Sequence, residues 1–212
     1  MWHRGSPRGL SVRYSISIGM SSAVKTLPNT KKGTMNIATI KTAILIGKFA
    51  LNDGTAKARL KINYENHPNE VLKDDAGRVY LLVKNGEIMK IGGSVSKGGI
   101  KSTMSFYVSA NTGRPSIRSF GINQLVYEAV TRGEEVSVYM ITSEQVSAPV
   151  KGLFGTEQMP ISAFKEMEEK CIADYVASEG NFPAWNYQEA GKAWEQYIQE
   201  EHAAILTATA SK

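Results

Sequence analysis

The segment Arg78-Val-Tyr-Leu-Leu-Val-Lys-Asn-Gly-Glu-Ile-Met-Lys-Ile-Gly-Gly-Ser94 decides the fold of this chain. Two strand-like runs, residues 78–84 and 87–91, flank the dipeptide Asn85-Gly86. Asn-Gly between two such runs is the strongest short-range signal for a β-hairpin, because both residues tolerate the positive φ of a type I′ turn. The segment therefore predicts two antiparallel strands joined by a two-residue turn.

The residues after this hairpin predict one more strand and three helices. Residues 116–132 have apolar side chains at helical spacing, and Gly133 follows them as a C-terminal cap. Residues 135–141 alternate as a strand, and after a glycine-containing loop the helical pattern returns at 162–178 and 188–205. The sequence thus predicts an α+β fold with a small antiparallel three-stranded sheet flanked by helices.

A second, more basic hairpin precedes this core. The runs 42–51 and 55–64 flank the turn Asn52-Asp53-Gly54. We expect this hairpin to be an extension to the core. Alternation along its second strand places three basic residues on one face: Lys57, Arg59 and Lys61.

Composition and charge narrow the class of protein. The chain has 212 residues, 42% of them hydrophobic, and a formal net charge of +5. No apolar run approaches the roughly 20 residues that cross a bilayer, so we expect no membrane partner and a cytoplasmic location. One cysteine and three distant histidines exclude a disulfide framework and a histidine-built metal site.

The positive charge gathers at the N-terminal end. Residues 1–62 hold eleven Lys or Arg against the single acid Asp53, whereas residues 156–201 hold ten acids against three lysines. Such a basic segment indicates a polyanionic partner, because each Lys or Arg near a phosphate releases a condensed counterion. A solvated, disordered basic tail over residues 1–34 is the alternative interpretation.

Tyr80 and Lys90 lie on the two strands of the central hairpin. Simple pairing about Asn85-Gly86 puts Tyr80 opposite Ile91 and Lys90 diagonal to it. The two side chains converge if a bulge or the Gly92-Gly93 end re-aims one of them. A strand aromatic in the core is the alternative interpretation of Tyr80.

The order of these motifs resembles the GIY-YIG nuclease family. Val79-Tyr80 stands for the family's "IY", and Lys90-Ile91-Gly92 for its "YIG", with lysine where most members have tyrosine. A branch of type II restriction enzymes in the family has a lysine there. Residues 164–172 resemble its glutamate helix, and Pro183-Ala-Trp-Asn186 its closing Pro-x-x-Asn.

The sequence divides into four expected parts. The resemblance covers residues 77–187, the expected nuclease-like domain, with Gly92 and Asn186 as structural residues. We expect residues 1–34 to be a basic segment that is disordered or non-native, and residues 35–76 to be the hairpin extension and a linker. Residues 188–212 form a C-terminal helix and tail.

Helix geometry selects one glutamate. Phe164, Glu168 and Ile172 fall on one stripe, whereas Glu166 and Glu169 lie outside it. A carboxylate inside an apolar stripe is costly unless it meets a cation or a metal. We therefore expect Glu168 to be the metal ligand, and a single carboxylate with several waters suits Mg²⁺, or Mn²⁺ in its place.

The expected arginine is missing from its usual place. The family has it about ten residues beyond "YIG", and here the nearest match is Lys101, which could hold a phosphate as a point charge. Arg114 and Arg118 follow later and are the alternatives. We place Lys97, Arg114 and Arg118 among the DNA-binding residues, together with the three basic residues of the first hairpin.

The resemblance implies a Mg²⁺-dependent DNA endonuclease of restriction or phage type that cuts double-stranded DNA. Its catalytic residues would be Tyr80 for activating water, Lys90 for lowering the pKa of that tyrosine, Lys101 for the phosphate charge and Glu168 for the metal. A homodimer would suit palindromic targets. The alternatives are a catalytically weak nucleic-acid-binding protein with this fold, and a small interaction protein.

Overall fold

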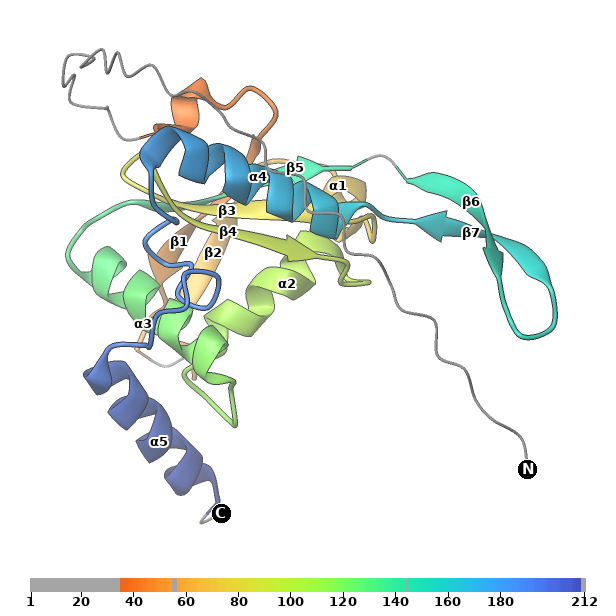
Figure 1. The fold of residues 1–212 in the computed structure, drawn as a ribbon. Helices are drawn as coiled ribbons and strands as arrows, with labels where there is room; N and C mark the ends of the chain where they lie inside the picture. Colours follow the sequence, from red (N-terminus) through yellow and green to blue (C-terminus); the bar gives the residue numbers. More distant parts are fainter. Residues whose placement is uncertain (1–34, 55–56, 144, 211–212) are drawn as a thin grey trace, which may run out of the picture. The chain divides into compact units, whose positions relative to one another are not determined.

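The structure is a computed structural model that describes residues 35–54, 57–143 and 145–210 (Figure 1). The predicted basic segment 1–34 lies outside the described residues. No helix in the described ranges is long and apolar enough to cross a membrane.

The main sheet is antiparallel and has five strands, where the sequence predicted three. It contains β1 (Ile44–Leu51), β2 (Leu60–Tyr64), β3 (Arg78–Lys84), β4 (Glu87–Ser94) and β5 (Val136–Thr142), in the order β2-β1-β5-β3-β4. The first hairpin is therefore part of the sheet and not an extension, because β1 pairs with β5. Its side chains Ile46, Phe49 and Leu60 are buried in the common core, which explains why the hairpin joins it.

The central hairpin has the predicted turn but a different register. Lys84 pairs with Glu87 and Val83 with Ile88, as expected, and then the register shifts between Leu82 and Val83. This β-bulge places Leu82 opposite Lys90 and Tyr80 opposite Gly92. Because paired residues of an antiparallel ladder point to the same face, Tyr80 and Lys90 share one face of the sheet.

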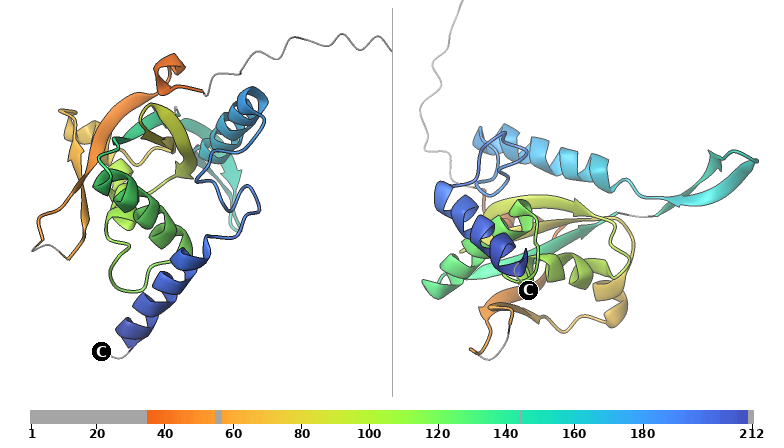
Figure 2. Two further views of the ribbon diagram at one scale, coloured as in Figure 1. Left: turned by 90° about the vertical axis from the view of Figure 1, so that its left-hand side faces the viewer. Right: turned by 90° about the horizontal axis from the view of Figure 1, so that it is seen from below.

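Helices cover both faces of the sheet (Figure 2). One face carries α2 (Gly99–Val108) and α3 (Ile117–Thr131), and the other carries α4 (Phe164–Glu179). Alternation along β3 explains the two cores, because Tyr80 and Leu82 pack toward α2 and α3, whereas Val79 and Leu81 pack toward α4. The predicted α+β fold with an antiparallel sheet flanked by helices is confirmed.

The remaining elements differ from the expected linker and helix. A short helix, α1 (Asn69–Lys73), lies within the predicted linker, and η1 (Ile37–Thr39) precedes β1. The last helix, α5 (Gln196–Ala210), begins eight residues later than predicted. Residues 187–194 instead form a turn in which the rings of Tyr187 and Trp194 stack with centroids 4.3 Å apart.

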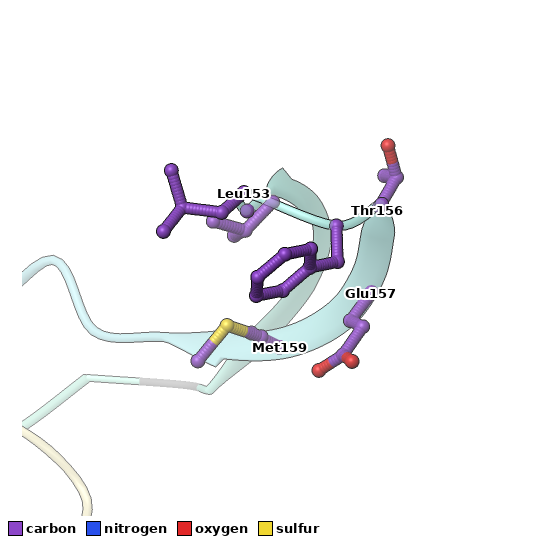
Figure 3. Close-up of a pocket in the computed structure, with 8 residues that line it drawn as sticks. Leu153, Thr156, Glu157 and Met159 are labelled. Carbon is purple, nitrogen blue, oxygen red and sulfur yellow. The ribbon is translucent and has the colours of Figure 1, made fainter.

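A two-stranded hairpin replaces the predicted loop between β5 and α4. Its strands, β6 (Val146–Lys151) and β7 (Thr156–Ile161), pair with each other and extend beyond the main sheet (Figure 1). At its tip Leu153 and Phe154 are 95% and 101% exposed, beside a hollow of about 380 Å³ (Figure 3). Its lining contains none of the candidate catalytic or DNA-binding residues.

Candidate active site at the edge of the main sheet

Strand β4 is an edge strand, and part of its free edge is covered. The backbone N–H of Trp185 donates to the Met89 carbonyl at 2.7 Å. The Asn186 side chain accepts from the Ile91 N–H and donates to the Ile91 carbonyl, both at 2.9 Å. These are contacts of the kind expected for a structural asparagine. These hydrogen bonds occupy the free edge of β4 as far as Ile91. The next residues of the strand are Gly92 and Gly93.

Two glycines let side chains from both faces approach the strand closely. A Cβ at Gly92 would collide with the hydroxyl group of Tyr80, and a Cβ at Gly93 would lie 2.5 Å from Oε2 of Glu168. Consecutive strand residues face opposite sides of a sheet. Tyr80 and Glu168 therefore reach β4 from its two faces, and each occupies the space that a glycine leaves free.

Tyr80 is joined to a second tyrosine that the sequence did not single out. The hydroxyl groups of Tyr80 and Tyr107, from α2, lie 2.6 Å apart, so one of them donates to the other. Burial raises the pKa of both phenols, and for Tyr80 the neighbouring Tyr107 raises it further. The positively charged side chain that lowers the pKa of both phenols is Arg118. From the sequence, Lys90 was expected to have this effect on Tyr80.

Lys90 is buried, with 1% of its surface exposed. Burial lowers the pKa of its ammonium group to about 8, and Arg118 lowers it as well, whereas Glu189 and Glu168 oppose the shift. A lysine with this pKa is partly neutral just above neutral pH. A burial of this kind, next to named charge partners, is typical of functional sites.

Arg118 belongs to the first turn of α3, which Ser116 caps by accepting from the Ser119 N–H at 3.2 Å. Burial lowers the pKa of the Arg118 guanidinium. The nearby Tyr107, Tyr80, Glu189 and Glu168 outweigh that effect, so the pKa is raised overall and the group stays charged. The structure thus brings together one of the two alternatives for the missing arginine with Tyr80, Lys90 and Glu168.

Lys101 lies away from this group. Its Nζ atom is 3.5 Å from Oδ1 of Asn69 and 5.2 Å from the ring centroid of Tyr64, on β2. The cause is local: Gly99 has a positive φ of 68° and fits closely against the α1 backbone, so α2 begins there and its first turn faces α1 and β2. The structure therefore places Lys101 beside α1 and β2 and does not bring it together with Tyr80, Lys90 and Glu168.

The first hairpin does not present the expected ribbon of three cations. Arg59 turns inward, and its guanidinium donates to Asn123 at 2.8 Å and to Gln124 at 2.6 Å, with the ring of Tyr127 4.2 Å away. Residues 57–59 precede β2 and are not strand, so alternation does not hold there. Lys57 and Lys61 are exposed.

Lys97 and Arg114 are exposed as well, in two different places. Lys97 lines a hollow at the base of the β6–β7 hairpin. Arg114 lines a shallow hollow of about 350 Å³ with Phe106, Ser116 and Ser119, at the start of α3. Of these two cations, Arg114 is therefore the one next to the first turn of α3, which carries Arg118.

The residues fit a magnesium ion held by one carboxylate. Glu168 is half-buried over Gly93, in a cradle that a Cβ would fill, whereas Glu166 and Glu169 are exposed. Within the described ranges, no group of three or more His, Cys, Asp or Glu residues could hold a metal ion. A single oxygen ligand matches Mg²⁺, which keeps several waters and takes further oxygens from substrate phosphates.

Two residues of this site were not predicted from the sequence. Tyr107 lies on α2, a helix that the sequence analysis did not predict because it begins with Gly98-Gly99. Glu189 was placed on a predicted helix, as one acid among several. The spacing of Glu189 from Asn186, which is tied to β4, is the one signal that could have found it.

Comparison with known proteins gives distant structural similarities, among them the two solved structures described below. No protein-family model matches the chain, and no curated protein matches it in sequence. A mutant of EndoII from bacteriophage T4 is 20% identical with a TM-score of 0.47, covering 71% of this chain and 95% of that chain. The restriction endonuclease HPY188I in complex with product DNA is 20% identical with a TM-score of 0.45, covering 72% and 86%. Similarity at this level leaves the function to be argued from the geometry of the site.

Proposed function

We propose that this protein is a Mg²⁺-dependent endonuclease that hydrolyses phosphodiester bonds of double-stranded DNA. One observation carries the proposal. Tyr80, Lys90 and Glu168 come from three different elements and each interacts electrostatically with Arg118, from a fourth, while Tyr80 packs against Gly92 and Glu168 against Gly93 of β4. A phenol can accept a proton from water, cations can stabilise charge on a phosphate, and a carboxylate can hold a metal ion, and these are the roles that phosphoryl transfer with one metal uses.

Glu168 would hold the metal over Gly93. When bound, Mg²⁺ supplies Lewis-acid chemistry that stabilises charge on the leaving oxygen of the phosphodiester. The partly buried carboxylate is oriented by α4, so it keeps its position without a second carboxylate. Gly93 leaves the room that this carboxylate needs to approach the strand.

Tyr80 would take the proton of the attacking water. Its phenol must lose a proton for this role, and burial works against that loss. Arg118 lowers the pKa of Tyr80, and the Tyr107 hydroxyl can donate to the phenolate oxygen across the 2.6 Å contact. Lys90, with a pKa of about 8, is mostly protonated at pH 7, and its charge would stabilise the phenolate on the same face of the sheet.

Arg118 would stabilise the charge that develops on the phosphate, in place of Lys101. A guanidinium offers two N–H groups side by side to a phosphate, which an ammonium group does not. Removing such a donor typically costs about 10²–10³ in rate.

The decisive experiment is incubation of the protein with plasmid DNA in Mg²⁺, in Mn²⁺ and in EDTA. Cleavage with either metal and none in EDTA is the expected result. DNA binding without cleavage in any of the three would contradict the proposal and favour the nucleic-acid-binding alternative. Absence of both binding and cleavage would favour an interaction protein.

A further inference from the structure

Arg118 is held by two consecutive residues of the turn after Asn186. Its Nη2 atom lies 3.4 Å from Oε1 of Glu189, and its Nη1 atom lies 3.5 Å from Oε1 of Gln188. Both distances are long for hydrogen bonds to a charged group, which are commonly about 2.7–2.9 Å. The pair is partly buried, with side-chain exposures of 39% for Arg118 and 22% for Glu189.

The second oxygen of Glu189 has no partner. Oε2 is buried and forms no hydrogen bond in the described part of the chain. A buried carboxylate oxygen without a donor costs free energy, because it has lost its water. The arrangement is therefore poor as a structural ion pair, because only one of the two carboxylate oxygens has a donor.

The place of Glu189 is fixed relative to β4. Asn186 is tied to Ile91 by two hydrogen bonds, and the N–H of Ala190 donates to the Asn186 carbonyl at 2.9 Å. Glu189 lies within this turn, between Asn186 and Ala190. Its negative charge acts on Lys90, Tyr107 and Arg118, which lie on β4, α2 and α3.

We propose that Glu189 is a positioning residue for Arg118. Its carboxylate holds the guanidinium beside the two phenols and leaves the remaining N–H groups for a phosphate of the substrate. When a phosphate draws the guanidinium inward, a second N–H of Arg118 can meet Oε2, so the long contact becomes bidentate. The inference rests on the proposed function for its consequence in catalysis, and on geometry alone for the orientation of Arg118.

The first test of this inference does not depend on activity. In ¹⁵N-labelled protein, the Nε–H signal of Arg118 is identified by its loss in Arg118→Lys. We expect this signal to be resolved and ordered in the wild type, and to become averaged in Glu189→Gln, which keeps the shape and removes the charge. Glu195→Gln is the matched control, because this exposed acid lies six residues further on, and it should leave the signal unchanged. An unchanged Arg118 signal in Glu189→Gln would overturn the proposal.

The second test separates positioning from binding. In Glu189→Gln, kcat for plasmid cleavage should fall roughly tenfold to a hundredfold, less than for loss of the donor itself. KM, and Kd for DNA measured in EDTA, should stay within about threefold. Cleavage at the wild-type rate, or tighter DNA binding with undiminished cleavage, would overturn the proposal, the latter because the carboxylate would then compete with phosphate. A wild-type protein that does not cut DNA would refute the proposed function and leave the Arg118 signal as the test of positioning.

Discussion

At the scale of single residues, Gly92 and Gly93 determine where the site can form. The hydroxyl of Tyr80 occupies the space beside Gly92, and the carboxylate of Glu168 occupies the space beside Gly93. Any side chain at either position would push one of them away from β4. The chemistry of the site therefore depends on two residues that carry no functional group.

The first prediction at this scale concerns the carboxylate. Glu168→Gln should abolish cleavage, because an amide oxygen carries no charge to hold Mg²⁺, and DNA binding should remain within about threefold. Plasmid cleavage and a binding titration in EDTA measure the two effects. Glu166→Gln is the control, since that glutamate is exposed two residues away and should cut normally. Equal activity of Glu168→Gln and the wild type would refute the metal assignment.

The second prediction concerns the buried ammonium group of Lys90. Its pKa falls from 10.5 to about 8 on folding, which corresponds to about 3 kcal/mol against the charged form. Lys90→Met should therefore raise the free energy of unfolding at pH 7 by up to about 3 kcal/mol, while cleavage is lost.

The stabilising effect of Lys90→Met should depend on pH between the folded and unfolded pKa values of Lys90. Above pH 8 the folded protein releases the proton of Lys90 and the unfolded chain keeps it up to 10.5, so the wild type gains stability as pH rises. The advantage of Lys90→Met should shrink across that window. Urea titrations at pH 7 and pH 9.5 measure it, and a constant difference would contradict the burial argument.

At the scale of elements, the central hairpin shows how far the sequence can lead. Asn85-Gly86 predicted the turn and both strands, because the turn chemistry is local. No local pattern marks the bulge that brings Tyr80 and Lys90 to one face, and the bulged strand β4 is bonded to Trp185 and Asn186, almost a hundred residues later. Likewise, α2 could not be predicted, because Gly98-Gly99 reads as a loop until α1 is packed against it.

Two helices compete for the role of the missing arginine, and the third prediction separates them. Arg118→Ala, on α3, should reduce kcat by about 10²–10³, because the phosphate loses its bidentate donor. Lys101→Ala, on α2, should reduce kcat less than about threefold, because its ammonium group lies near Asn69 and Tyr64. Single-turnover cleavage measures both, and a larger loss for Lys101→Ala would reverse the assignment.

The β6–β7 hairpin gives the fourth prediction. Its two strands pair with each other, every residue of β7 is exposed, and an isolated two-stranded hairpin contributes little stability in water. Replacing residues 146–161 with a short Gly-Ser linker should change the free energy of unfolding by less than about 0.5 kcal/mol. A chemical denaturation curve checks this. A large loss of stability would mean that the hairpin supports the main sheet.

At the scale of the whole molecule, the exposed cations form a path that leads away from the site. Arg114 adjoins the turn that carries Arg118, and the loop before it contacts the segment that precedes β2, where Asn111 donates to the Lys57 carbonyl at 3.0 Å. Lys61 follows on β2. The sequence predicted these cations but not their connection, which the loop between α2 and α3 makes.

This path gives the last prediction, on the salt dependence of DNA binding. Each cation that contacts a phosphate adds about one unit to the slope of log K against log salt. The double variant Lys57→Ala, Arg114→Ala should therefore lower the slope by about two units and leave the free energy of unfolding unchanged. Arg59→Ala should leave the salt slope unchanged and lower the free energy of unfolding by about 2–3 kcal/mol, because Asn123 and Gln124 would lose their buried donor. If Arg59→Ala instead lowered the slope of log K against log salt and left the stability unchanged, Arg59 would contact DNA and its inward position would be contradicted.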